Sequence, residues 1–162
     1  MAEKNLETLF HDTLKDIYYA ERTILKALPK MARGAEAPEL KQAFLDHKSE
    51  TEVQVERLQQ VFEIIGKRAQ GKTCPAIDGI IEEGEEIMSE YKGTPALDAG
   101  LIAAAQAVEH YEITRYGTLA TWAKQLGRED CASVLVETLE EEKEADEILT
   151  DVAKGRVNAE AA

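Results

Sequence analysis

Residues 10–28 of the chain read FHDTLKDIYYAERTILKAL, with apolar side chains at steps of three and four residues and one gap of seven. The apolar members are Phe10, Leu14, Ile17, Ile24 and Leu28. This spacing predicts that they lie along one face of an α-helix. Glu21 fills the gap, so a carboxylate stands where the pattern otherwise has an apolar side chain.

Helical spacing continues along nearly the whole chain, and strand-like alternation is absent. We expect long helices over residues 5–33, 38–66, 95–126 and 129–153, a short amphipathic helix within 70–93, and a frayed tail at 157–162. Short turns make neighbouring helices antiparallel, and a long connection carries the chain back along the bundle. The predicted fold is therefore all-α, a single domain over residues 1–162. It is a four-helix bundle with hairpins at 5–69 and 95–155 and a crossover at 70–94.

The charge balance narrows the classes of partner. The chain has 19 Lys and Arg residues against 32 Asp and Glu residues, a net charge of −13. Because such an acidic chain repels phosphate backbones and anionic lipids, we expect neither nucleic acid nor membrane as a partner. The N-terminus has no signal-peptide pattern, and Cys74 and Cys131 are too few for a secreted disulfide framework. We therefore expect a cytoplasmic protein.

The two predicted hairpins match each other at an offset of 91 residues. Glu21 then matches Glu112, and Glu50 matches Glu141. We place Glu21, Glu112 and Glu141 in the middle of the apolar stripes of their helices. The stripe of the second helix is broader, and at this level it passes through Glu50 or Thr51. In the last helix we assign the stripe to Val134, Thr138, Glu141, Ala145, Ile148 and Val152, which leaves Glu142 on the surface.

Antiparallel helices of similar length bring their midpoints together, so the four carboxylates are expected at one level inside the bundle. Without counter-charge they cannot all stay ionised. Protons, the guanidinium of Arg115 or cations could neutralise them, and a pair of metal ions would satisfy all four. Neighbouring helical turns add three candidates. The predicted metal-binding residues are Glu21, His47, Glu50, Glu109, Glu112, Glu141 and Glu144. The two ions are expected to be iron, with manganese or zinc as alternatives.

Several motifs, in order and at matching spacing, connect the chain to a known family. They are Tyr18-Tyr19-Ala20-Glu21, Ala27-Leu28-Pro29-Lys30-Met31, the segment around His47, Glu109-His110-Tyr111-Glu112 and residues 138–146. With them the chain resembles the YciE/YciF group of stress-associated proteins in the ferritin-like superfamily. The resemblance implies a ferritin-like bundle with a short fifth helix in the crossover, a homodimer and a link to bacterial stress responses. It also implies that Glu21 and Glu112 are terminal carboxylates and that Glu50 and Glu141 are bridging ones.

The chain departs from the Glu-x-x-His pattern of di-iron proteins. Val53 and Glu144 stand three residues after Glu50 and Glu141, where that pattern has histidine. This departure argues against strong ferroxidase activity, so neither an enzyme activity nor a catalytic residue is assigned. The predicted function is a di-metal protein linked to stress that handles iron, oxygen or peroxide. The alternative is a non-enzymatic structural or adaptor bundle with a degenerate metal site.

Overall fold

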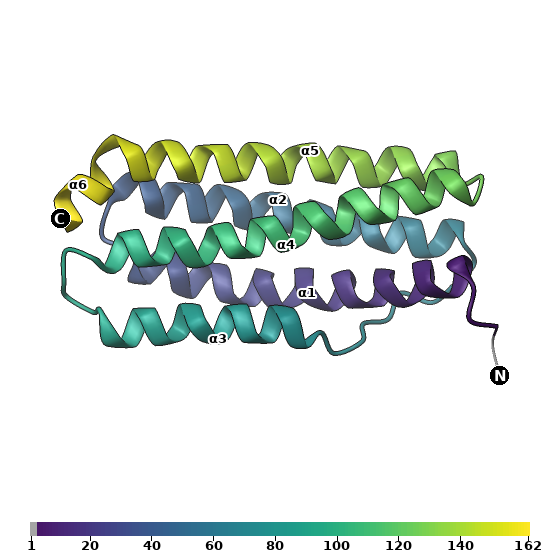
Figure 1. The fold of residues 1–162 in the computed structure, drawn as a ribbon, viewed down its shortest axis with the longest axis horizontal. Helices are drawn as coiled ribbons and strands as arrows, with labels where there is room; N and C mark the ends of the chain where they lie inside the picture. Colours follow the sequence, from purple (N-terminus) through teal and green to yellow (C-terminus); the bar gives the residue numbers. More distant parts are fainter. Residues whose placement is uncertain (1–2) are drawn as a thin grey trace.

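The computed structural model describes residues 3–162, which form a bundle of helices (Figure 1). Its long helices are α1 (Leu6–Gly34), α2 (Pro38–Ile64), α4 (Leu97–Gln125) and α5 (Glu129–Val152). Helix α3 (Pro75–Glu90) lies in the crossover, and the chain ends in a π-helical turn (Ala153–Val157) and α6 (Asn158–Ala161). Residues 3–162 contain no strand. The prediction of an all-α, ferritin-like bundle with a fifth helix in the crossover is therefore confirmed.

Local sequence signals set most helix ends. The side chain of Asn5 caps α1 by accepting a hydrogen bond from Thr8 N at 3.0 Å. Gly66 follows the end of α2 where the crossover begins, and Gly127 lies in the turn between α4 and α5. Their φ values are 67° and 71°, in the left-handed region that favours glycine. Helix α4 begins two residues later than expected. Thr94 lies in a turn, where its N–H donates to Tyr91 O, and the helix starts only at Leu97.

The tail differs from the expected frayed segment. Its residues stay helical to Ala161, and Val157 is only 2% exposed because it packs against the core. Burial of this apolar side chain stabilises the short terminal segment against the fraying expected of a chain end. The prediction of fraying from residue 157 is therefore wrong.

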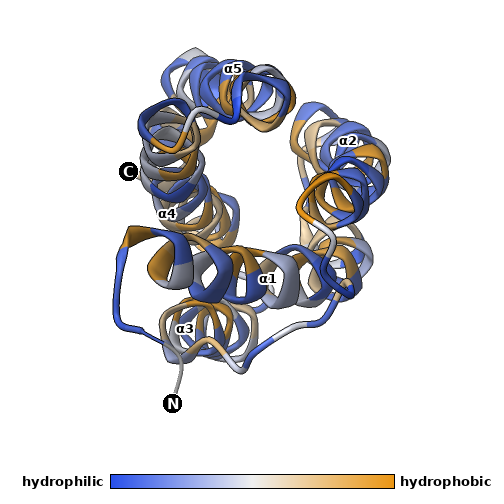
Figure 2. Cartoon of the chain, turned by 90° about the vertical axis from the view of Figure 1, so that its right-hand side faces the viewer, coloured by the Kyte–Doolittle hydropathy of each residue, from blue (hydrophilic) through white to orange (hydrophobic). Residues whose placement is uncertain are grey.

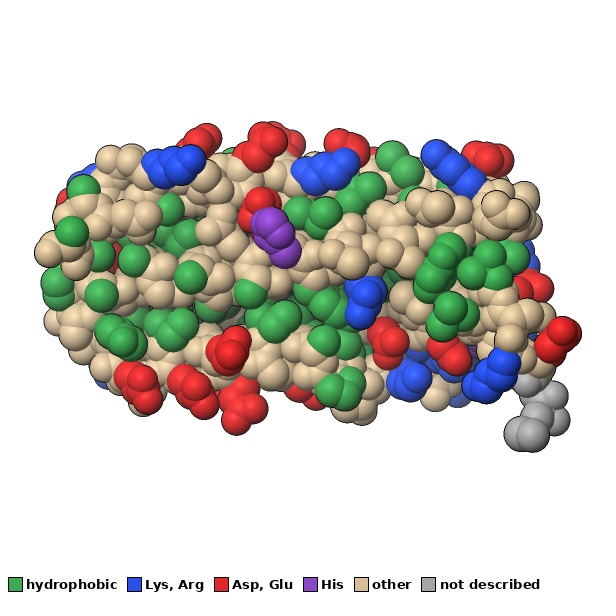
Figure 3. Space-filling model, viewed as in Figure 1, with side chains coloured by type: hydrophobic (Ala, Val, Ile, Leu, Met, Phe, Trp, Pro, Cys, Tyr) green, Lys and Arg blue, Asp and Glu red, His purple; other side chains and the backbone are tan. Residues whose placement is uncertain are grey.

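The long helices surround a common interior, and α3 lies outside it, against α1 and α4 (Figure 2). Fully buried aliphatic side chains fill that interior, among them Leu14, Ile17, Leu58, Leu101 and Leu119. Acidic side chains gather along the outer edge of α3, which carries the run Glu82-Glu83-Gly84-Glu85-Glu86 (Figure 3). Within residues 3–162, every helix is too short or too polar to cross a bilayer.

A contact between distant segments holds the turn before α2. Ala37, at the N-cap position of α2, has no side chain that could cap the helix. The buried carboxylate of Asp98 in α4 instead accepts hydrogen bonds from the backbone N–H groups of Glu36 at 2.8 Å and Ala37 at 2.7 Å. This contact ties the first hairpin to the second at one end of the bundle.

Candidate metal centre

Four acids and one histidine lie together inside the bundle, each near the middle of its helix. Glu21 comes from α1, His47 from α2, Glu109 and Glu112 from α4, and Glu142 from α5. Glu21, Glu112 and Glu142 are 0% exposed, Glu109 is 2% exposed and His47 is 7% exposed. We call these five residues the acid cluster. All four long helices contribute to it.

Four members of the acid cluster converge on one point. One nitrogen or oxygen atom from each of His47, Glu109, Glu112 and Glu142 lies within 4.8 Å of the other three. His47 Nε2 is 3.1 Å from Glu109 Oε1 and 4.0 Å from Glu112 Oε2. Metal–ligand bonds to such atoms are about 2.0–2.2 Å long, so ligands on opposite sides of one ion lie roughly 4.4 Å apart. The four side chains could therefore contact a single ion after small movements.

Glu21 is held by a tyrosine on the opposite helix. The buried Tyr116 hydroxyl of α4 donates a 2.6 Å hydrogen bond to Glu21 Oε1. The other oxygen, Oε2, has no hydrogen-bond partner among the described residues. One oxygen of Glu21 is thus positioned by the protein, and the second remains available.

Unpaired polar atoms are concentrated at this site. Among residues 3–162, the buried side-chain nitrogens and oxygens without a hydrogen-bond partner all belong to the acid cluster or to Gln54. Buried polar groups are normally paired, because leaving one unpaired costs about 1–3 kcal/mol. A concentration of unpaired carboxylate oxygens and imidazole nitrogens fits the binding of cations, for which such atoms are the usual ligands.

Burial changes the protonation of the acids. It raises the pKa of Glu21 to about 8, and the charge of Glu142 adds to that shift, whereas the hydrogen bond from Tyr116 opposes it. Burial also raises the pKa of Glu109 and of Glu112 well above the usual range, and Glu142 adds to both shifts. Without a cation, these three carboxyls therefore retain protons at neutral pH.

Glu142 is the member of the cluster that carries the negative charge. Burial alone would raise its pKa, but the protonated Glu109 and Glu112 carboxyls beside it favour its charged form and lower the pKa below the usual range. Burial also lowers the pKa of His47, so its imidazole is neutral and able to act as a ligand. The metal-free cluster is thus one charged carboxylate surrounded by protonated neighbours.

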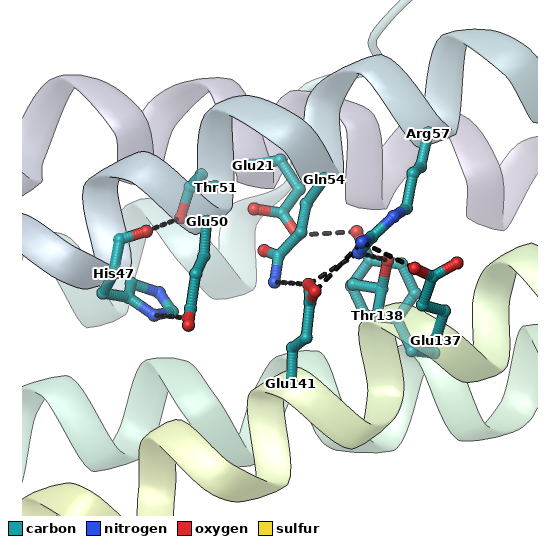
Figure 4. Close-up of polar contacts among 10 residues, drawn as sticks. Glu21, His47, Glu50, Thr51, Gln54, Arg57, Glu137, Thr138 and Glu141 are labelled. Atoms are coloured by element: carbon teal, nitrogen blue, oxygen red, sulfur yellow. Dashed lines mark hydrogen bonds and ion pairs between the residues drawn. The ribbon is translucent and has the colours of Figure 1, made fainter.

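The structure corrects the predicted site on α5. Glu141, expected in the core, faces α2 at the side of the bundle, where Arg57 Nη1 and Nη2 lie 2.6 and 3.0 Å from its two oxygens (Figure 4). Its neighbour Glu142, expected at the surface, occupies the core position instead. Glu144 is exposed, and Glu50 has a side chain that is 45% exposed, so neither belongs to the acid cluster.

The error has a simple geometric cause. Successive residues of an α-helix are about 100° apart around the helix axis. A stripe that is assigned with an error of one residue therefore lies on a different face of the helix. The true stripe runs through Leu135, Thr138, Glu142 and Leu149, all buried, whereas Ile148 of the assigned stripe is 46% exposed. The two stripes share Thr138 and both contain apolar residues at helical spacing, so periodicity alone could not separate them.

A seven-residue step would have found Glu142. Leu135, Glu142 and Leu149 follow the same step as Leu14, Glu21 and Leu28 in α1. The offset of 91 residues between the hairpins also holds, but the core pair that it matches is Glu142 and the fully buried Thr51. Glu141 and Glu50, the pair expected in the core, match each other outside it. Glu109 does share the buried face of Glu112, as their spacing predicted.

Arg115 does not supply the counter-charge that the sequence left open as an option. Its guanidinium carbon lies 5.0 Å from the centre of the Tyr111 ring, a cation–π contact. Tyr111 in turn makes a 3.0 Å contact through its hydroxyl with Cys74 Sγ. Arg57 is the arginine that meets a predicted ligand, and it meets Glu141 outside the acid cluster.

Comparison with known proteins gives a consistent result along the whole chain. A family described as Domain of unknown function (DUF892) matches residues 5–162. Protein YciF of Escherichia coli strain K12 is 46% identical over 162 residues, which is 99% of this chain and 98% of the relative.

Three solved structures have a similar fold. The crystal structure of the E. coli stress protein YciF has a TM-score of 0.92 at 46% identity and covers 96% of this chain and 99% of its own. YcfI of Rhodopseudomonas palustris has a TM-score of 0.89 at 48% identity, with 91% and 94% covered. A Xanthomonas campestris protein shares the fold at 24% identity, with a TM-score of 0.74 and 96% and 94% covered.

Proposed function

The chain belongs to the family described as Domain of unknown function (DUF892), and from this premise we propose that it is a metal-binding ferritin-like protein that acts in a bacterial stress response. The stress role is carried over from YciF, which is described as a stress protein and shares 46% of its sequence with this chain. The metal-binding role is supported by the acid cluster itself.

One observation carries the proposal: within residues 3–162, the buried side-chain oxygens and nitrogens without a hydrogen-bond partner lie on the acid cluster and on the adjoining Gln54. Four carboxylates and one imidazole form a hard, oxygen-rich ligand set, which suits iron or manganese, with zinc also compatible. We propose iron as the native metal, because its trivalent form gains most from an anionic ligand set.

We propose two ions rather than one. His47, Glu109, Glu112 and Glu142 would hold the first. Glu21 Oε2 and Gln54 Oε1, both buried and without partners among the described residues, would serve the second, with Glu112 and Glu142 shared between the ions. Carboxylates that bridge two cations neutralise charge at both, which is the usual arrangement in ferritin-like sites.

A bound ion would supply a Lewis-acidic centre, redox-active in the case of iron, for handling iron, oxygen or peroxide. The residues of the chain have separate tasks. Glu21, Glu109 and Glu112 would hold a cation after losing their protons, and Tyr116 keeps one oxygen of Glu21 in place. Arg57 holds Glu141 at the side of the bundle, so that this carboxylate does not compete for the ion.

A second candidate is a non-enzymatic bundle with a degenerate site. It is favoured by Thr51, which stands at the α2 position equivalent to Glu142 and donates its hydroxyl to His47 O at 2.7 Å. The chain therefore lacks at Thr51 the carboxylate that a symmetric di-metal site would have there. Metal bound without any turnover of oxygen or peroxide would favour this candidate.

Metal titration of chelator-stripped protein tests the proposal. Fe(II) under anaerobic conditions, Mn(II) or Co(II) is expected to raise the melting temperature, because an ion that binds only the folded state stabilises it by about 2.7 kcal/mol at a concentration of 100 Kd. Glu142→Gln should abolish this response. Glu147→Gln, which makes the same chemical change at an exposed position of α5, should leave it intact. Equal responses from the two variants would contradict the proposal.

The homodimer implied by the sequence resemblance remains a proposal as well. Light scattering is expected to give twice the chain mass of 18.0 kDa. A monomer, or a large closed shell, would rule the dimer out.

A further inference from the structure

A cavity lies next to the acid cluster, and its exposed lining residues, Asp46 and Ile148, come from α2 and α5. Most of its walls are apolar and include Ile24, Phe44 and Leu149. Its polar lining consists of Asp46, His47 and Glu50 from α2 and Glu109 from α4. Two of these four residues belong to the acid cluster, so the cavity connects the cluster with the surface.

The polar residues of this cavity become progressively less exposed from its rim to the acid cluster. Asp46 is exposed at the rim, and the Glu50 side chain is 45% exposed. The side chains of His47 and Glu109 are 8% and 3% exposed. Oxygen and nitrogen atoms therefore follow one another from solvent to the buried cluster along a wall that is otherwise apolar.

His47 connects the outer and the inner acids. Its Nδ1 lies 3.9 Å from Glu50 Oε2, and its Nε2 lies 3.1 Å from Glu109 Oε1. Neither ring nitrogen has an aligned hydrogen-bond partner within residues 3–162, although the side chain is more than nine-tenths buried. A buried imidazole with both nitrogens unpaired between two carboxylates indicates a position where a cation can be passed inward.

The neighbouring part of the contact between α2 and α5 is closed to cations. Arg57 lies there, bound to Glu141 and to Glu137 at 3.0 Å, and Gln54 Nε2 donates to Glu141 Oε1 at 3.2 Å (Figure 4). A guanidinium group repels an approaching cation and neutralises the carboxylate that would attract it. Of the matched pair Glu50 and Glu141, only Glu50 is without an arginine partner in the described chain.

We infer that the cavity wall formed by Asp46, Glu50 and His47 is the path by which divalent cations reach the acid cluster, and that Glu50 is a transient ligand on this path. The inference rests on the proposed metal binding and adds a route to it. Fields from acids that line a narrow opening raise association rates by about 10- to 1,000-fold. Glu50 therefore controls the rate of metal uptake, whereas the acid cluster controls the affinity.

Stopped-flow mixing of Co(II) with chelator-stripped protein, followed by the visible absorbance of the bound ion, tests this path. Glu50→Gln is expected to slow uptake at least about tenfold and to leave the final amount of bound Co(II) unchanged. Glu56→Gln is the matched control, because it removes the same charge from an exposed position of α2 outside the cavity. Ala145→Leu, which narrows the cavity without changing charge, should also slow uptake.

The outcomes separate the two proposals. A wild-type chain that binds no Co(II) overturns both. If the wild type binds Co(II) and Glu50→Gln loads as fast as Glu56→Gln, the path is wrong and the metal centre stands. A large loss of bound Co(II) at equilibrium in Glu50→Gln would make Glu50 a permanent ligand and also overturn the path.

Discussion

Tyr116 of α4 donates a 2.6 Å hydrogen bond to Glu21 of α1, and both side chains are buried in the interior of the bundle. The contact connects the two helices of the bundle that carry equivalent glutamates, Glu21 and Glu112. It also lowers the pKa of Glu21 against the larger effect of burial, which raises it. One tyrosine thus fixes the geometry of Glu21 and limits the free-energy cost of burying its carboxyl group.

Tyr116→Phe is expected to destabilise the metal-free protein by about 1–3 kcal/mol, because Glu21 Oε1 loses its donor in a site that water does not reach. Urea denaturation of chelator-stripped protein measures this loss. Tyr91→Phe is the control, since Tyr91 is 46% exposed and its hydroxyl has no partner among the described residues. If Tyr116→Phe and Tyr91→Phe lowered the free energy of unfolding by the same amount, the hydrogen bond would not hold Glu21.

The stability of the metal-free protein should depend on pH in the direction opposite to that of most proteins, whose acids stabilise the folded state more as pH rises. Glu21 has a pKa raised to about 8, so at neutral pH the folded state binds a proton that the unfolded state has released. Stability of the metal-free protein is therefore expected to fall as pH rises from about 6.5 to about 8. Glu109 and Glu112, whose pKa values burial also raises, act in the same direction.

Urea midpoints across that pH range measure the slope, and Glu21→Gln should flatten it because the amide does not titrate. His47 opposes the trend only at the acid end of this range. Burial lowers its pKa, so near its ordinary value of 6.5 the unfolded imidazole still binds a proton that the folded one has released, and at higher pH both are neutral. A midpoint that rises with pH in the wild type would show that the cluster acids are ionised in the folded state.

Asp98 offers a test of the fold that is independent of metal. Asp98→Ala is expected to cost about 1–3 kcal/mol, because the N–H groups of Glu36 and Ala37 lose their acceptor. Asp98→Asn keeps one acceptor oxygen and should lower the free energy of unfolding by a smaller amount. Asp151→Ala, at an exposed position, should change stability by less than about 0.5 kcal/mol in the same denaturation experiment.

The sequence was sufficient for the fold because helix spacing, caps and turn glycines all agree, as at Asn5 and Gly127. It located Glu21, His47, Glu109 and Glu112, which stand between apolar neighbours at clear helical spacing. It failed at the run Glu140-Glu141-Glu142, where three identical residues cover most of the helix circumference. Only packing decides which of them faces inward, and Arg57, distant in sequence, holds Glu141 away from the interior.

The central claim is that Glu142, and not Glu141, completes a metal centre with His47, Glu109 and Glu112. Anomalous diffraction from crystals of stripped protein soaked in Co(II) tests it most directly. We predict an anomalous peak within about 2.0–2.2 Å of these four side chains in the wild type and in Glu141→Gln, and no such peak in Glu142→Gln. A peak bound by Glu141, or an empty acid cluster at saturating Co(II), would contradict the account.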